Sequence, residues 1–359
     1  MSFVDKMRVI RDNIRFNIYK LRYDYKSPFN EGDFNFDNIK HIVISKVDGK
    51  LGDTEVLSPF FKTLQKAFPN ILISVITLDN LKAIYEDCIK VTNTIISPKK
   101  RPNKAQVQSF CKDIKKLGPC DLLIFLDEKV RPREFYLINE LKPKFIAGTN
   151  SKLNCINIKI NINPQEHMSH ALNSLLLKGG IKDIETSYVP FIKDDLVKKY
   201  KELFKDLKVV GFAPYGAGSV RQLSLNTQKD MLSYIKDHTD YKVVLMLPPD
   251  KISDKHILEK FLGSREQHIE DKITVLELGS IIGAVDAMIS VDTANLHLAC
   301  AFDSPLYALH PSLQNATVWG PINNKKNCIK FYKEGKDIST LLYNDLKDSF
   351  ESFVNKYLV

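Results

Sequence analysis

The stretch His41–Asn70, HIVISKVDGKLGDTEVLSPFFKTLQKAFPN, decides the fold of the first half of the chain. The apolar run HIVIS predicts a buried strand, and the run that begins near Val56 predicts an amphipathic helix. Between them lies a loop with a Gly-Asp pair, Gly52 and Asp53. In open α/β sheets, ligands bind at such loops, beyond the carboxyl ends of the strands. Asp53 is therefore either a helix-capping residue or a group that takes a proton from a substrate.

The order of strand and helix repeats along the whole chain. Four more apolar runs follow before residue 150, with helix-like segments between them. After the crossing segment Ser187–Asp195 a second series begins, with the runs KVVGFAP, YKVVLMLP, KITVLEL, AVDAMISV and PLYALH. Helices are expected over Thr227–His238 and Asp254–Phe261. Apolar runs of this length between helices indicate parallel, doubly wound sheets. We expect an α/β protein with two Rossmann-like domains facing a central cleft.

These patterns predict four parts of the chain. They are a basic amphipathic extension (residues 1–40), an N-terminal domain (41–186), a C-terminal domain (187–336) and a last helix (337–359). The last helix is expected to pack back on the N-terminal domain. In the extension, Val9, Ile10, Ile14, Phe16, Ile18 and Leu21 approximate a helical stripe among many basic residues. This stripe predicts either packing on the first domain or contact with anionic lipid.

The composition of the chain indicates which partners, location and metal sites to expect. A net charge of +9 over 359 residues favours an anionic partner, and nucleic acid is the weaker choice because no run combines aromatic and basic residues. No apolar run approaches the ~18–20 residues of a membrane helix, and charges throughout the first 20 residues argue against a signal peptide. We therefore expect a cytoplasmic protein. The six cysteines lack a C-x-x-C pair, and His167 and His170 lack a third ligand, so no metal site is expected.

The segment Gly211–Ser224, GFAPYGAGSVRQLS, is a candidate anion-binding turn. Glycines allow backbone N–H groups to approach an anion, and an arginine can hold a phosphate with two hydrogen bonds. The residues concerned are Gly216, Gly218, Ser219 and Arg221. The spacing is neither G-x-G-x-x-G nor a P-loop. A glycine-rich turn alone is more often only a turn, but the adjacent serine and arginine favour a phosphate.

The segment Met288–Phe302, MISVDTANLHLACAF, is a second strand-to-helix junction. Asp292 or Thr293 is expected either to cap the helix or to shape a phosphate site with the nearby amides. His297 in the first turn is either a packed core residue or part of that site. In the first junction, Lys46 and Lys50 flank Asp53, and Asp48 is a competing carboxylate.

Together, the three stretches resemble the ADP-heptose:lipopolysaccharide heptosyltransferases, glycosyltransferase family 9. The family's first loop appears here as ISKVDGKLGDTEVLSPFFKTLQKAFPN, and its later motif as SVDTANLHLACAFDSPLYALHPS followed by WGP. The resemblance covers about residues 40 to 325. It implies the two-domain GT-B fold and transfer of heptose from ADP-heptose to the lipopolysaccharide inner core, with inversion and without a metal or cofactor.

The resemblance also implies site residues. Asp53 matches the general base, and Arg221, behind Gly216, Gly218 and Ser219, matches the group that neutralises the leaving diphosphate. Asp292, Thr293, Ala294 and His297 match the donor-phosphate loop, and Asp250 matches an acid that holds the ribose. Three residues depart from the family pattern, because Ala294 and His310 replace glycines and Asp250 replaces a glutamate.

On the acceptor side, Lys46, Lys50, Arg131 and Arg133 are expected to bind carboxylates and phosphates of an anionic lipid A–core acceptor. The alternative for EKVRPRE is a solvated charged loop. The implied location is the cytoplasmic face of the inner membrane of a Gram-negative bacterium. Three other functions stay open: a nucleotide-sugar 2-epimerase of the same fold, a GT-B transferase with another nucleotide sugar or acceptor, and an inactive binding module.

Overall fold

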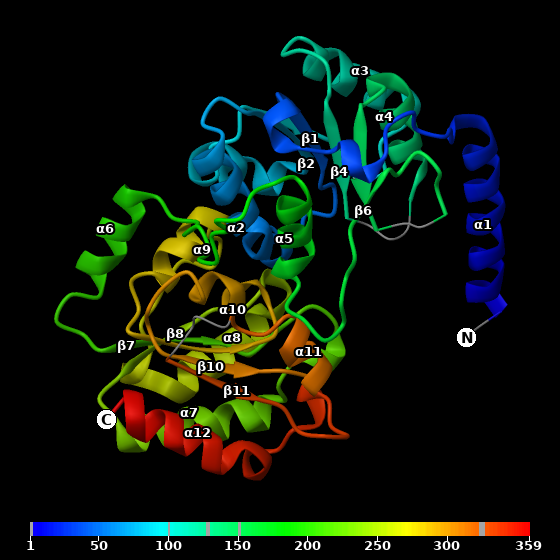
Figure 1. Cartoon of the computed structure of the whole chain (residues 1–359). Helices are drawn as coiled ribbons and strands as arrows, with labels where there is room; N and C mark the ends of the chain where they lie inside the picture. The colour runs from blue at the N-terminus through cyan, green and yellow to red at the C-terminus, as the bar shows by residue number, and fades with distance from the viewer. Residues whose placement is uncertain (1–2, 100, 127–129, 150–151, 323–326) are drawn as a thin grey trace. The chain divides into compact units, whose positions relative to one another are not determined.

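The computed structural model describes residues 3–99, 101–126, 130–149, 152–322 and 327–359 (Figure 1). The chain divides into two compact units. The first unit comprises residues 1–49, 60–162 and 169–185, and the second comprises residues 50–59, 163–168 and 186–359. Both contain a parallel sheet with helices around it, as the strand–helix alternation predicts. The expected class, two Rossmann-like α/β domains, is therefore confirmed.

The first unit is built on a six-stranded sheet with the order β3-β2-β1-β4-β5-β6, in which every neighbouring pair is parallel. The strand from HIVIS, β1, lies near the centre and is buried along its whole length. The strands are β1 (His41–Ser45), β2 (Leu72–Thr77), β3 (Asn93–Ile96), β4 (Leu122–Phe125), β5 (Phe145–Gly148) and β6 (Ile158–Lys159). The helices are α1 (Phe3–Tyr23), α2 (Leu51–Ala67), α3 (Lys104–Lys115), α4 (Pro132–Leu141) and α5 (Ser169–Lys178).

The helix of the N-terminal extension, α1, packs on the first unit through aromatic side chains. The rings of Phe16 and Tyr19 lie 5.9 and 5.7 Å from that of Phe135 in α4, centroid to centroid. The hydroxyls of Tyr19 and Tyr136 share a hydrogen bond of 2.8 Å. The packing expectation for the extension is therefore met. The aliphatic side chains of α1 whose burial is described, however, remain exposed: Met7, Val9, Ile10, Ile14, Ile18 and Leu21.

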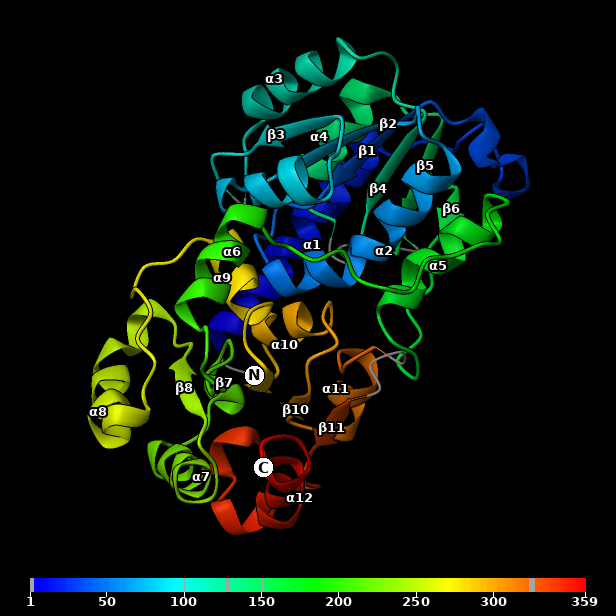
Figure 2. The ribbon, with the colours of Figure 1, turned by 90° about the vertical axis from the view of Figure 1, so that its left-hand side faces the viewer.

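The second unit has a five-stranded parallel sheet with the order β11-β10-β9-β7-β8 (Figure 2). Its strands are β7 (Val209–Ala213), β8 (Lys242–Leu245), β9 (Ala287–Val291), β10 (Leu306–Leu309) and β11 (Cys328–Phe331). Its helices are α6 (Asp194–Leu203), α7 (Leu225–His238), α8 (Ile252–Leu262), α9 (Val275–Ile282), α10 (Ala294–Ala299), α11 (Leu313–Val318) and α12 (Tyr343–Tyr357). Strands β7, β9 and β10 are adjacent, so the loops at their carboxyl ends share one edge of the sheet.

The first half of α2, residues 50–59, belongs with the second unit, although the sequence placed it in the N-terminal domain. Within that unit the Ser58 hydroxyl accepts a hydrogen bond of 2.9 Å from the backbone N–H of Val189. The division between the units falls after Pro59, which lies inside the helix and cannot donate a helical hydrogen bond. Asp53 is therefore part of the second unit.

Two sequence-based expectations are wrong. The run KITVLEL is not a strand, because α9 begins at Val275 and Thr274 caps it in a capping box with Glu277. The last helix does not pack on the N-terminal domain. Side chains on one face of α12, including Phe350 and Phe353, join the core of the second unit beside β10 and β11. Amphipathic periodicity gives the buried face of a helix but not the surface that covers it.

Candidate functional site

The glycine-rich turn follows β7 and lies against the loop after β9. The backbone N–H of Gly216 donates a hydrogen bond of 2.8 Å to the carbonyl oxygen of Arg221, which closes the turn. A Cβ atom on Gly216 would lie 2.7 Å from the main-chain oxygen of Asp292, so only glycine fits. Gly218 has a φ of +83°, in the left-handed region that favours glycine. Ser219, which begins the next turn, is exposed.

A chain of polar side chains connects the carboxyl ends of β7, β9 and β10. Arg221 Nη1 donates to Asp292 Oδ2 at 2.9 Å, and Asn315 Nδ2 donates to the same oxygen at 3.0 Å. The ring nitrogen Nδ1 of His310 is hydrogen-bonded to Asn315 Oδ1 at 2.9 Å. The side chain of Asp292 is only 4% exposed, whereas that of Arg221 is 35% exposed. A buried carboxylate thus holds a partly exposed guanidinium group.

This arrangement fixes the orientation of Arg221. Its Nε donates to the carbonyl oxygen of Ala217 at 2.9 Å, while Nη1 is held by Asp292. Two hydrogen bonds to a planar guanidinium group fix its plane, so less side-chain freedom is lost when an anion binds. The geometry suits recognition of a phosphate or diphosphate at this edge of the sheet.

The partly exposed Thr293 precedes α10, and the buried His297 lies within this helix. Thr293 takes the N-cap position, but its side chain makes no capping hydrogen bond. His297 is 4% exposed, and its ring lies 6.3 Å from that of Trp319. Burial lowers the pKa of His297 to about 4, against the opposing effect of the nearby Asp292 carboxylate. The imidazole is therefore neutral at pH 7 and serves the packing of this junction.

Gly52 brings the first turn of α2 against the first turn of α10. A Cβ atom on Gly52 would lie 2.7 Å from His297 Cδ2 and 3.4 Å from the Cα atom of Ala294. Only glycine permits this approach without a shift of the neighbouring atoms. Ala294, one of the departures from the family pattern, is thus a packing contact of Gly52.

Asp53 lies in the first turn of α2, which begins at Leu51. Its side chain is 27% exposed and forms an ion pair with Lys50, with 3.4 Å between Nζ and Oδ2. The competing carboxylate, Asp48, is in the first unit and forms an ion pair with Lys46, which is buried. Each of the two carboxylates of the loop therefore forms an ion pair with a lysine of the same loop, and Asp53 is the one that belongs to the second unit.

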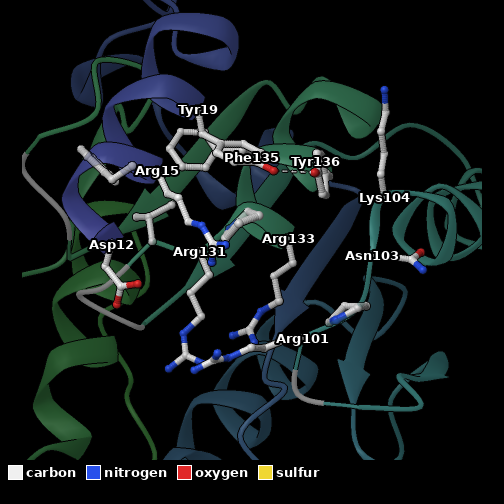
Figure 3. A pocket seen from close by; sticks show the side chains of 14 residues that line it. Asp12, Arg15, Tyr19, Arg101, Asn103, Lys104, Arg131, Arg133, Phe135 and Tyr136 are labelled. Carbon is white, nitrogen blue, oxygen red and sulfur yellow. Dashed lines mark hydrogen bonds between the residues drawn. The ribbon is translucent and has the colours of Figure 1, made fainter. Parts of the chain in front are cut away.

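The remaining predicted residues are dispersed. Asp250 is exposed in a turn after β8, where Lys251 lies over the ring of Tyr215, 4.9 Å from its centroid. In the first unit, Arg131 precedes α4, and the buried Arg133 forms an ion pair with the buried Glu134. Both arginines line a cavity (Figure 3). Arg133 is therefore not part of a solvated loop.

The described residues offer one group of possible metal ligands, Glu259, Glu266 and His268, which includes none of the predicted site residues. His167 is buried and its Nε2 is hydrogen-bonded to the carbonyl oxygen of Gly320 at 3.0 Å, consistent with a structural role. In the described part of the chain, no helix combines the length and apolar composition required to cross a bilayer.

Two parts of the site were not predicted. Asn315 orients Asp292 from 23 residues further along the chain, and no local pattern marks it. The role of Gly52 was also missed, although the Gly-Asp pair was noticed. The sequence contained a signal for this role, because a glycine in the first turn of a helix indicates a close approach of another part of the chain.

Replacing Gly52 with alanine is expected to lower the free energy of unfolding by roughly 1–3 kcal/mol, because the added methyl group overlaps His297. Gly32→Ala is the matched control, since no atom lies within 4 Å of the methyl group it would add. Urea denaturation measures both. Equal stability of the two variants would contradict the close contact.

His297→Asn is expected to reduce the pH dependence of stability. In the wild type the unfolded chain binds a proton at His297 near pH 6.5, but the folded protein only near pH 4. As the pH falls between these values, the free energy of unfolding therefore decreases, by on the order of 3 kcal/mol. The variant should lack this part of the decrease, whereas a variant of an exposed histidine, His256→Asn, should keep it. Denaturation at pH 4, 5, 6 and 7 tests this, and equal slopes in all three proteins would refute it.

Part of the chain matches a known protein family. Residues 191–341 match the model of glycosyltransferase family 9 (heptosyltransferase). The matched segment holds the glycine-rich turn, Asp292, His297 and Asn315. A protein of Escherichia coli strain K12 described as putative lipopolysaccharide heptosyltransferase 4 is 24% identical over 347 residues, which cover 90% of each chain.

Solved structures share the fold. A glycosyl transferase of family 9 from Veillonella parvula has a TM-score of 0.72 at 18% identity, covering 88% of this chain and 97% of that one. The E. coli ADP-heptose lipopolysaccharide heptosyltransferase II has a TM-score of 0.69 at 14% identity, covering 89% and 99%. At these identities the likeness establishes the fold, which is that expected from the sequence. Residues 191–341 therefore match glycosyltransferase family 9 (heptosyltransferase), and the protein is a glycosyltransferase.

Proposed function

We propose that the protein transfers a heptose from ADP-heptose to the inner core of lipopolysaccharide, with inversion and without a metal ion. The observation that carries the proposal is Arg221, held by Asp292 and Ala217 at the glycine-rich turn within the matched family segment. A preorganised cation stabilises a leaving diphosphate without reorganisation during the reaction. The relatives' descriptions, which name heptose transfer to lipopolysaccharide, support this choice of substrates.

In the proposed mechanism, Asp53 removes the proton from the acceptor hydroxyl. The acceptor oxygen then forms a bond to the anomeric carbon while the bond from that carbon to the diphosphate oxygen breaks. ADP leaves with the bonding electrons, and Arg221 balances the charge that develops on it. Thr293, whose hydroxyl is not used as a helix cap, is a further donor for the diphosphate. Ser219, Gly216 and Gly218 shape the same turn, and Asp250 is proposed to contact the ribose.

Asp53→Asn is expected to lower kcat for heptose transfer by 10²–10⁴-fold, because an amide cannot accept the proton. ADP binding should not change. The assay uses purified protein, ADP-heptose, and cores with no heptose or one heptose, in EDTA. Asp48→Asn is the matched control from the same loop and should keep its activity. Full activity of Asp53→Asn would show that Asp53 is not the general base. Loss of activity in Asp48→Asn alone would show the same.

The alternatives differ in what they consume. An epimerase of this fold would convert a nucleotide sugar without an acceptor, and an inactive binding module would bind ADP without turnover. The family match over residues 191–341 favours a transferase. In the same assay, loss of nucleotide sugar in the absence of any core would indicate the epimerase.

We further propose that α1 lies on the anionic cytoplasmic face of the inner membrane, where such an acceptor is found. One face of α1 carries aliphatic side chains that are 52–59% exposed at Met7, Ile10, Ile14 and Ile18 and 91% exposed at Leu21. Phe16, Tyr19 and Tyr23 on the opposite face pack on the first unit. The exposed basic residues Arg11, Arg15 and Arg22 add attraction to anionic lipid.

Ile14→Glu is expected to weaken binding to vesicles that contain phosphatidylglycerol several-fold, because it places a charge in the aliphatic face. Asn13→Glu adds the same charge one residue away, outside that face, and should bind more tightly than Ile14→Glu. Co-sedimentation with anionic and with neutral vesicles measures both. Equal binding of the wild type and Ile14→Glu would show that α1 has only a packing role.

A further inference from the structure

A cavity of about 340 Å³ lies within the first unit, between α1, the loop before α3 and the start of α4 (Figure 3). Five cationic side chains line it, those of Arg15, Arg101, Lys104, Arg131 and Arg133. Asp12 is the only carboxylate among the lining residues of this cavity in the described part of the chain, and it pairs with Arg11. Three separate segments thus deliver positive charge to one place.

The side chains of Arg15, Arg101 and Arg131 all line the cavity (Figure 3). Among the described residues, the ion pairs include none of these three arginines. Arg133 differs, because the buried Glu134 holds it. Like charges in one cavity repel one another, and because Asp12 is the only carboxylate among the described lining residues, an anion of two or more charges would reduce that repulsion. Arginine forks match the oxygens of phosphate groups.

The other wall of the cavity is aromatic. The rings of Tyr19 and Phe135 lie 5.7 Å apart, and the hydroxyl of Tyr19 is hydrogen-bonded to that of Tyr136 at 2.8 Å. Aromatic side chains beside a cluster of arginines are suited to packing against a sugar ring that carries a charged substituent. The backbone N–H of Arg131 donates to Glu134 Oε2 at 2.9 Å, so this group is not available to a ligand.

We propose that this cavity binds the phosphate group of a phosphorylated saccharide, through Arg15, Arg101 and Arg131. Helix α1, which lies outside the matched family segment, completes the site by providing Arg15 and Tyr19. The ligand comes from one of two sources with the same chemistry, a phosphorylated acceptor or a free sugar phosphate. Only the first source rests on the proposed function.

The test is calorimetric titration of the full chain with glucose 1-phosphate, inorganic phosphate and glucose at constant ionic strength. Wild type should bind glucose 1-phosphate more tightly than phosphate and should not bind glucose. The double variant Arg15→Gln/Arg131→Gln should lose at least tenfold in affinity. Lys112→Gln removes an exposed positive charge from α3 outside the cavity and should bind as wild type does. Thermal denaturation verifies that each variant is folded.

Equal affinity of the double variant and wild type would overturn the proposal, as would an equal loss of affinity in Lys112→Gln. Equal binding of phosphate and glucose 1-phosphate would overturn the assignment to a saccharide. Titration of the variant Arg221→Gln with glucose 1-phosphate tests for binding at the second unit. Loss of the binding signal in this variant would also refute the cavity as the site.

The two sources are distinguished by transfer kinetics. A higher KM for the acceptor at unchanged kcat in the double variant would identify the acceptor as the ligand. Weaker binding of glucose 1-phosphate with unchanged transfer would identify a free sugar phosphate. Absence of transfer in the wild type, with binding of glucose 1-phosphate intact, would refute the proposed function but not this site.

Discussion

The ion pair between Arg221 and Asp292 is the interaction on which the rest of the site depends. A buried carboxylate without a partner would be strongly unfavourable, and here Arg221 and Asn315 both donate to Oδ2. In return, the carboxylate orients a guanidinium group that remains partly exposed. The pair joins the loops after β7 and β9, and Asn315 adds the segment after β10. Hydrogen bonds therefore link the loops at three strand ends around the guanidinium group of Arg221.

The close contact at Gly52 gives a structural reason for the glycine of the Gly-Asp pair. The glycine permits the first turn of α2 to approach Ala294 and His297, and the next residue is Asp53. Burial keeps His297 neutral, so the contact places no additional charge beside Asp292. The packing between these two helix starts thus contributes to the position of Asp53, together with its ion pair to Lys50.

The faces of helix α1 have different surroundings. Its aromatic face is buried on α4, Arg15 points into the cavity, and the aliphatic face is exposed. A helix that only covers a core would keep its aliphatic side chains inside, since their exposure forgoes hydrophobic stabilisation. The distribution is instead typical of a helix that lies on a membrane.

The sequence by itself determined the α/β class, the two parallel sheets and the strand-to-helix junctions that hold Asp53, Arg221 and Asp292, because hydrophobic periodicity and glycine positions are local properties. Tertiary structure alone decided which unit residues 50–59 join, that α12 covers the second sheet, and that KITVLEL becomes helix under the Thr274 cap. It also decided the partners of Asp292 and the convergence of Arg15, Arg101 and Arg131. These contacts join residues distant in sequence, and their energies depend on burial and proximity, which no local pattern contains.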